Sequence, residues 1–168
     1  LVLLLGVVAG CSSPDEPVTT SSQQTTAVQL SDLDITTGQT VYVPAYSEMF
    51  ITPNRTIDLA VTLTFHNTDF EHPIFLTSVR YYNPDGQLLR EYVTEPQRLG
   101  PLAATEFFVE ADEQGDGLGT NFVVEWVAEE PVFEPIVEAI MLNVANNQGI
   151  SLTSPGRVIN QIEPLPEE

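Results

Sequence analysis

Apolar and polar residues alternate along most of the chain from Gln39 onward, which is the pattern of a β-strand with one face in a core. The clearest case is residues 57–65, where every second residue is large and apolar. Residues 74–82 and 88–93 are also rich in strand-forming residues, and the turn sequence Asn-Pro-Asp-Gly at 83–86 separates them. Proline fixes φ in such a turn and glycine tolerates the left-handed exit, so we expect a hairpin here.

Further strands are indicated after this hairpin. Alternation recurs at 106–110 and 122–127, and it places Trp126 in the core. Residues 137–144 are apolar at nearly every position, which predicts a strand covered on both faces. A last short strand is expected at 150–152, and no segment shows sustained helical periodicity. The sequence therefore predicts an all-β fold, an antiparallel β-sandwich of about seven to eight strands and of the immunoglobulin-like type.

The N-terminus has the features of an export signal. Residues 1–10 are uninterruptedly apolar, too short to span a bilayer but typical of the core of a secretory signal peptide. Val8, Ala9 and Gly10 precede Cys11, which is the arrangement of a bacterial lipobox whose thiol receives lipid. The alternative is a buried N-terminal strand that ends in an incidental thiol. There is no initiator Met and no basic segment, so we expect the signal peptide to be truncated at its start.

This interpretation divides the chain into four parts. Residues 1–11 are the signal peptide with the lipobox cysteine, and 12–39 form a polar Ser/Thr/Gln-rich linker. Residues 40–162 form the sandwich domain, and 163–168 are an acidic tail. Acyl chains on Cys11 would anchor the protein firmly, and Ser12 after the cysteine favours the outer membrane, facing the periplasm.

The charge balance excludes some partners. The chain of 168 residues has 24 acids and 5 bases, a formal net charge of −19. Binding to nucleic acid is excluded because too few bases are present to neutralise phosphates. Between Arg98 and Arg157 every charged residue is acidic, which indicates either a solubility adaptation to a saline habitat or a surface for a basic partner or a divalent cation.

Two segments carry candidate metal chemistry. Residues 66–72 contain two histidines and two carboxylates, which indicate either a transition-metal site or a solvated strand end. Residues 112–121 offer Asp112, Asp116 and Asn121 between glycines, either as a hard-cation site or as a hairpin loop that caps its own backbone. A single cysteine excludes a disulfide framework within the chain, and no cofactor is implied.

Six short motifs resemble a known bacterial family. They are VYVPAYS at 41–47, LTFHNTD at 63–69, SVRYY at 78–82, LGPLA at 99–103, NFVVEW at 121–126 and QGIS at 148–151. In this order they resemble the family catalogued as domain of unknown function 3124, found in cyanobacteria and proteobacteria. The resemblance implies an exported, often lipid-anchored protein without an assigned activity, and it supplies no catalytic residues. The family pattern often has another basic residue at His66 and a glycine at Asp116, which counts against either as a family-wide ligand.

These observations favour a protein that is not an enzyme, because no nucleophile elbow accompanies the two histidines and the one cysteine is assigned to lipid. We expect a lipid-anchored envelope protein whose sandwich binds or scaffolds another envelope protein. The alternative is a periplasmic domain that binds a divalent cation or another ligand. A scaffold should expose an apolar patch, whereas an enzyme should gather polar groups in a cleft.

Overall fold

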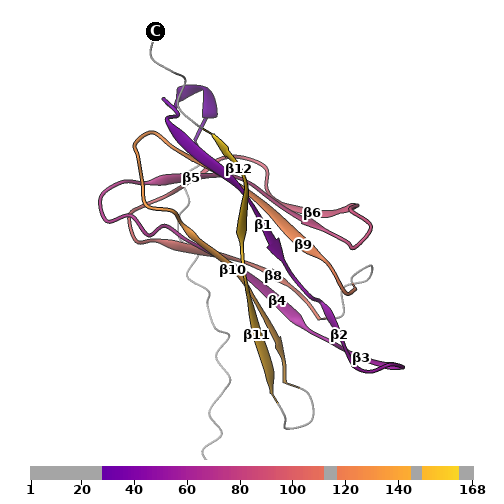
Figure 1. Ribbon diagram of the computed structural model, residues 1–168. Helices are drawn as coiled ribbons and strands as arrows, with labels where there is room; N and C mark the ends of the chain where they lie inside the picture. The colour runs from indigo at the N-terminus through magenta and orange to yellow at the C-terminus, as the bar shows by residue number, and fades with distance from the viewer. Residues whose placement is uncertain (1–27, 112–116, 145–148, 163–168) are drawn as a thin grey trace, which may run out of the picture.

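Strands make up nearly all of the regular structure in the computed structural model, which describes residues 28–111, 117–144 and 149–162 (Figure 1). The elements in chain order are η1 (Leu30–Asp32), β1 (Thr37–Pro44), β2 (Glu48–Thr52), β3 (Arg55–Asp58), β4 (Ala60–His66), β5 (Ile74–Tyr82), β6 (Leu88–Val93), β7 (Gln97–Leu99), β8 (Ala104–Val109), β9 (Asn121–Ala128), β10 (Ile136–Asn143), β11 (Ile150–Pro155) and β12 (Arg157–Ile162).

The strands form two main antiparallel sheets. The larger has the order β12-β1-β9-β5-β6, with β7 also paired to β5, and the smaller has the order β11-β10-β4-β8. Strands β2 and β3 form a separate hairpin that projects from the sandwich (Figure 1). The core between the sheets contains the inward side chains of both, among them Val43, Leu63, Phe122 and Met141. The predicted all-β antiparallel sandwich is therefore confirmed.

Local alternation located several strands well. β5 and β6 have the bounds that the sequence predicted, and Val79 lies opposite Val93 in their pairing. The run at 57–65 is instead divided between β3 and β4 at Leu59, which is fully buried and whose N–H donates to the Ser47 carbonyl at 2.7 Å. The expected number of strands was too low, since the described residues form twelve. The hairpin β2–β3, short β7 and separate β12 account for much of the difference.

The expectation of a strand covered on both faces was wrong for β10. Val137, Ala139 and Met141 are buried, but Ile136 and Leu142 on the same strand are exposed. The reason is that the described residues form a sandwich of two layers, so the outer face of the smaller sheet meets solvent even where the sequence is apolar.

The domain begins before position 40. β1 starts at Thr37, and the Thr36 N–H donates to the Ala128 carbonyl at 3.0 Å. Further upstream, the Val28 N–H donates to the Pro96 carbonyl at 3.0 Å. The described part of the chain therefore contacts the edge of the larger sheet between β6 and β7, and it then enters β1 beside the end of β9.

Candidate functional site

The β4–β5 loop, residues 67–73, is folded around the buried side chain of Asn67. Its Nδ2 donates to the carbonyls of His72 and Gly100, both at 2.9 Å. Its Oδ1 accepts the N–H of Asp69 at 3.0 Å. One amide therefore closes its own loop and fixes it to the turn between β7 and β8, as asparagine does when it replaces backbone partners in a turn.

Asp69 joins this loop to the segment before β10. Its Oδ1 accepts the N–H of Glu71 at 2.8 Å and of His72 at 2.7 Å, and its Oδ2 accepts the N–H of Phe133 at 3.2 Å. The donors at Glu71 and then His72 are the main cause that lowers the pKa of Asp69 below its ordinary value, because they stabilise the charged carboxylate. Phe133 is 64 positions away in sequence from Asp69, so this carboxylate joins two loops that are distant in the sequence.

Four large apolar side chains project from these joined segments. Phe70 is 72% exposed, Phe133 66%, Leu102 59% and Ile136 55%. Phe70 and Phe133 line one open hollow of about 530 Å³ together with Asp69, His72 and Pro131. The Leu102 N–H donates to the Asp69 carbonyl at 3.0 Å, so the β7–β8 turn lies beside them. We call Phe70, Leu102, Phe133 and Ile136 the loop-end patch.

Acidic residues border the loop-end patch. A second hollow of about 270 Å³ is lined by Asp34, His72, Pro73, Glu129 and Glu130. The Asp34 N–H donates to the Glu129 carboxylate at 3.2 Å, which fixes the segment before β1 to this end of the sandwich. The combination is an exposed aromatic surface with a negative border.

The two histidines do not assemble a metal centre. His72 Nδ1 lies 3.3 Å from Asp69 Oδ1, whose oxygens already accept backbone N–H groups. His66 is exposed at the end of β4, opposite Ala104 and Ile136. Among the described residues no group of three or more His, Cys, Asp or Glu side chains is placed to hold a metal ion. His66 is a solvated strand end, as one interpretation of residues 66–72 expected, but Asn67 and Asp69 in the same segment are buried and hydrogen-bonded.

Other residues singled out by the sequence lie mostly outside the described ranges. This applies to the lipobox residues Val8, Ala9, Gly10 and Cys11 and to Asp112 and Asp116. Asn121 is described and opens β9, opposite Pro44 in β1 and Tyr82 in β5. In the ranges that the structure covers, no helix has the length and apolar character needed to cross a membrane.

The residues of the loop-end patch were not predicted from the sequence. Ile136 is the first residue of β10, whereas Phe70, Leu102 and Phe133 lie outside the strands, and only the turn-forming neighbours of these three residues indicate their exposure. Phe70 stands between Asp69 and Glu71, and Phe133 stands two residues after Pro131 and two before Pro135. A large apolar residue in such a turn sequence has no adjacent strand position that would bury it.

A family model described as "Protein of unknown function (DUF3124)" matches residues 38–159. The chain belongs to this family. The match runs from β1 into β12, so the DUF3124 domain is the sandwich itself, and the resemblance in the six motifs is confirmed. No curated protein matches the chain. A solved structure described as "Crystal Structure of Thermotoga maritima 1070" is similar at 13% identity and a TM-score of 0.39, over 71% of this chain and 92% of that chain.

Proposed function

We propose that this DUF3124 protein is a lipid-anchored component of the bacterial cell envelope whose sandwich binds another envelope protein without catalysing a reaction. The observation that supports this most directly is the loop-end patch, in which four large apolar side chains are each more than half exposed. Contiguous exposed apolar groups rimmed by polar residues are typical of protein interaction sites.

The polar groups at this end support binding over catalysis. The side chains of Asn67 and Asp69 are hydrogen-bonded to backbone groups of the β4–β5 loop, the β7–β8 turn and the segment before β10. Their role is to hold the patch in place, because a fixed aromatic surface loses little conformational entropy when it binds. An enzyme site would instead present convergent polar groups toward a substrate.

The position of the anchor supports the same proposal. Cys11 and Val28 are 17 positions apart, so the chain between them spans at most roughly 60 Å. Asp34, six residues after Val28, is hydrogen-bonded to Glu129 at the end of the sandwich that carries the loop-end patch. Lipid on Cys11 would therefore keep the patch near the membrane, where the outer membrane is the expected location. The acidic border would be repelled by anionic lipid, and it favours a protein partner with basic groups.

Site-specific photocrosslinking tests the proposed surface. Phe70→benzoylphenylalanine and Phe133→benzoylphenylalanine, in cells that make the lipid-anchored protein, should give a discrete crosslinked species. Phe50→benzoylphenylalanine is the matched control, because Phe50 is 58% exposed but lies on the projecting β2–β3 hairpin. Equal crosslinking at position 50, or none at 70 and 133, would contradict the proposed interface.

The anchor has a separate test. Cys11→Ser should move the protein from the detergent phase to the aqueous phase, or leave it unprocessed, because the lipidated thiol is absent. A detergent-phase fraction unchanged by this substitution would contradict lipidation. The crosslinking result would then support a protein interface but not a lipid anchor.

A further inference from the structure

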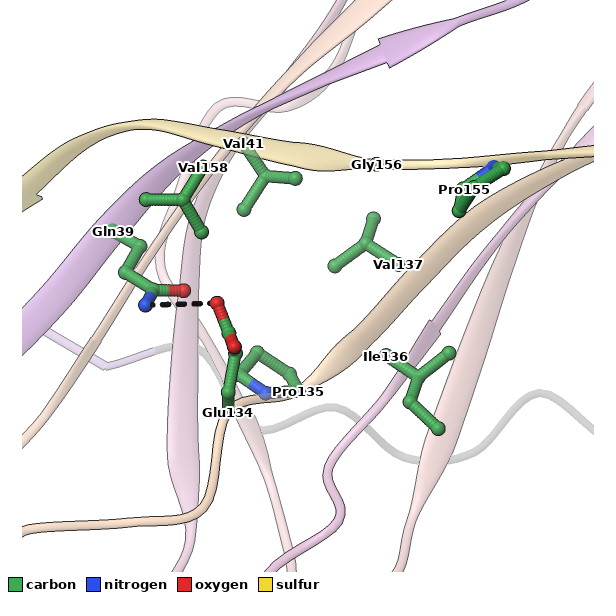
Figure 2. A pocket seen from close by; sticks show the side chains of 9 residues that line it. All are labelled: Gln39, Val41, Glu134, Pro135, Ile136, Val137, Pro155, Gly156 and Val158. Atoms are coloured by element: carbon green, nitrogen blue, oxygen red, sulfur yellow. Dashed lines mark hydrogen bonds between the residues drawn. The ribbon is translucent and has the colours of Figure 1, made fainter.

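A groove opens between the two sheets of the sandwich, and Ile136 is the one residue that it shares with the loop-end patch (Figure 2). It has a volume of about 290 Å³ and lies between β1 and β12 of the larger sheet and the start of β10 in the smaller one. Its lining residues are Gln39, Val41, Glu134, Pro135, Ile136, Val137, Pro155, Gly156 and Val158. A volume near the lower limit for ligand pockets suits a small group and not a drug-sized molecule.

One end of the groove is formed by the crossover from β11 to β12. The chain leaves the smaller sheet at Pro155 and joins the larger one at Arg157, so Gly156 bridges the two layers. The Gly156 N–H donates to the Val137 carbonyl at 2.7 Å. A Cβ at position 156 would lie 2.6 Å from Val41 Cγ1, so the chain is tightly packed at this end, and Gln39 and Glu134 lie at the other end of the groove.

The end of the groove at Gln39 and Glu134 presents two hydrogen-bond acceptors. Gln39 is 9% exposed, and its Nε2 donates to Glu134 Oε1 at 3.2 Å. A carboxylate only accepts, so this bond fixes the amide with its nitrogen toward Glu134 and its oxygen toward the valines of the groove (Figure 2). The Gln39 Oε1 is buried and has no hydrogen-bond partner among the described residues. A buried acceptor without a donor is rare in folded proteins.

The remaining walls carry no polar side chain. They consist of three valines, two prolines and Ile136, and among them Val41, Val137 and Pro135 are buried. Such a surface accommodates methylene groups. No basic side chain lines the groove, and the net charge of −19 favours the approach of cations.

We infer that this groove binds the end of a primary alkylammonium group, with methylenes along the valines and the ammonium between Gln39 Oε1 and the Glu134 carboxylate. An ammonium supplies three N–H donors around a compact charge, which can satisfy an amide oxygen and a carboxylate together. Glu134 is exposed and can rotate to admit it. A free alkylamine and a lysine side chain share this chemistry. The two polar groups that recognise the ammonium, Gln39 and Glu134, are not part of the loop-end patch, so the inference does not rest on the proposed interface.

A titration of the full-length protein with n-butylammonium tests the inference. Binding is followed by ¹H–¹⁵N NMR at constant ionic strength. We expect saturable shifts of the Gln39 side-chain amide and of the Gly156 backbone amide, because both flank the groove. n-Butyltrimethylammonium has the same charge without N–H donors, and n-butanol has the chain without the charge. Each should bind at least fivefold more weakly if donors and charge are both recognised.

Substitutions separate the groove from general attraction to an acidic protein. Glu134→Gln and Gln39→Met should each weaken binding roughly fivefold, the loss expected for one hydrogen bond or exposed charge contact. Glu130→Gln is the matched control, since it removes the same charge outside the groove, and it should change affinity less than twofold. Glu134 is exposed, so its variant keeps the test valid if Gln39→Met folds poorly.

Several outcomes would overturn the inference. They are unchanged Gln39 and Gly156 resonances at saturating amine, equal binding of the trimethylammonium analogue, and a loss for Glu130→Gln as large as for Glu134→Gln. Comparison of n-butylammonium with Nα-acetyl-lysine-N-methylamide distinguishes the sources: equal affinity supports a lysine side chain, and much weaker affinity of the lysine derivative supports a free amine. Neither result changes the expected crosslinking at positions 70 and 133. If the groove does not bind the amine, the proposed protein interface at the loop-end patch is therefore not contradicted.

Discussion

Trp126 is held in the core by its apolar surface and not by its polar group. The residue is 2% exposed and lies in β9 between Gln39 of β1 and Leu76 of β5. Its indole Nε1 is buried and finds no hydrogen-bond partner in the described part of the chain. Alternation in the sequence correctly predicted that Trp126 is buried. It could not predict whether the side chains of the neighbouring strands β1 and β5 offer a hydrogen-bond acceptor to the indole N–H.

Trp126 therefore predicts a difference between two substitutions. Trp126→Ala should lower the free energy of unfolding by roughly 3–5 kcal/mol, the usual loss when a large aromatic leaves a core. Trp126→Phe should cost less than about 2 kcal/mol, because it keeps an aromatic ring and removes a buried N–H that lacks an acceptor. Urea unfolding of both variants measures the difference. Equal losses would mean that the indole N–H is hydrogen-bonded in solution.

Asp69 predicts a pH-dependent loss of stability. Its pKa is lowered in the folded protein, mainly by the N–H groups of Glu71 and His72, so the charged form stabilises the fold above the unfolded-state pKa of about 3.9. Below that pH the unfolded chain takes up the proton first, and the contribution fades as pH falls toward the folded pKa. Asp69→Asn should therefore be less stable than wild type at pH 7, with a difference that shrinks below pH 4.

Unfolding midpoints from pH 7 to pH 3 measure this difference. Asp85→Asn changes the same charge at an exposed turn position and serves as the control for overall repulsion. Amide exchange of Phe133 should also quicken in Asp69→Asn, because an amide nitrogen at the Oδ2 position cannot accept the Phe133 N–H. An Asp69 effect that is constant over the whole pH range would contradict the assigned role of the carboxylate.

At the scale of elements, the sequence predicted where several strands lie along the chain, but it did not predict which of their faces are covered. Alternation is local, and it located β5 and β6 at both ends. Whether β10 is covered on its outer face depends on a third layer, which the described residues do not form, so Leu142 was wrongly expected to be buried. The loop-end patch was missed for the same reason, since it depends on the bond between Asp69 and Phe133 across 64 positions. The immunoglobulin-like subtype stays a prediction.

The crossover between β11 and β12 predicts contrasting effects at two glycines. Gly156→Ala places a Cβ 2.6 Å from Val41 Cγ1 and 2.9 Å from the Val137 carbonyl oxygen, so it should cost roughly 1–3 kcal/mol through overpacking. Gly149→Ala has nothing within 4 Å of its Cβ and should stay within about 0.5 kcal/mol of wild type. Thermal unfolding of both variants measures this. A neutral Gly156→Ala would mean that the two sheets are looser at this edge.

At the scale of the whole molecule, the uneven charge is the dominant feature. The net charge is −19, and the base-free stretch from position 99 to 156 supplies most of the smaller sheet together with β9. Local pairing relieves part of this repulsion, as where Arg80 in β5 contacts Glu125 in β9 at 2.6 Å. The acids beside the loop-end patch and the groove both favour positively charged partners, so the same excess of charge serves the two proposed binding surfaces.

This charge predicts a stability that depends on salt. Raising NaCl from 0.05 to 0.5 M shortens the screening length from roughly 14 Å to about 4 Å, which removes repulsion between acids on different strands. The melting temperature should therefore rise by several degrees over this range. Glu106 on β8 and Glu130 in the β9–β10 loop are exposed acids. The double substitution Glu106→Gln/Glu130→Gln should raise the melting temperature in 0.05 M NaCl and have little effect on it in 0.5 M NaCl. A gain that persists in high salt would indicate a local effect of the amides, whereas a melting temperature indifferent to NaCl would show that the acids are too dispersed to destabilise the fold.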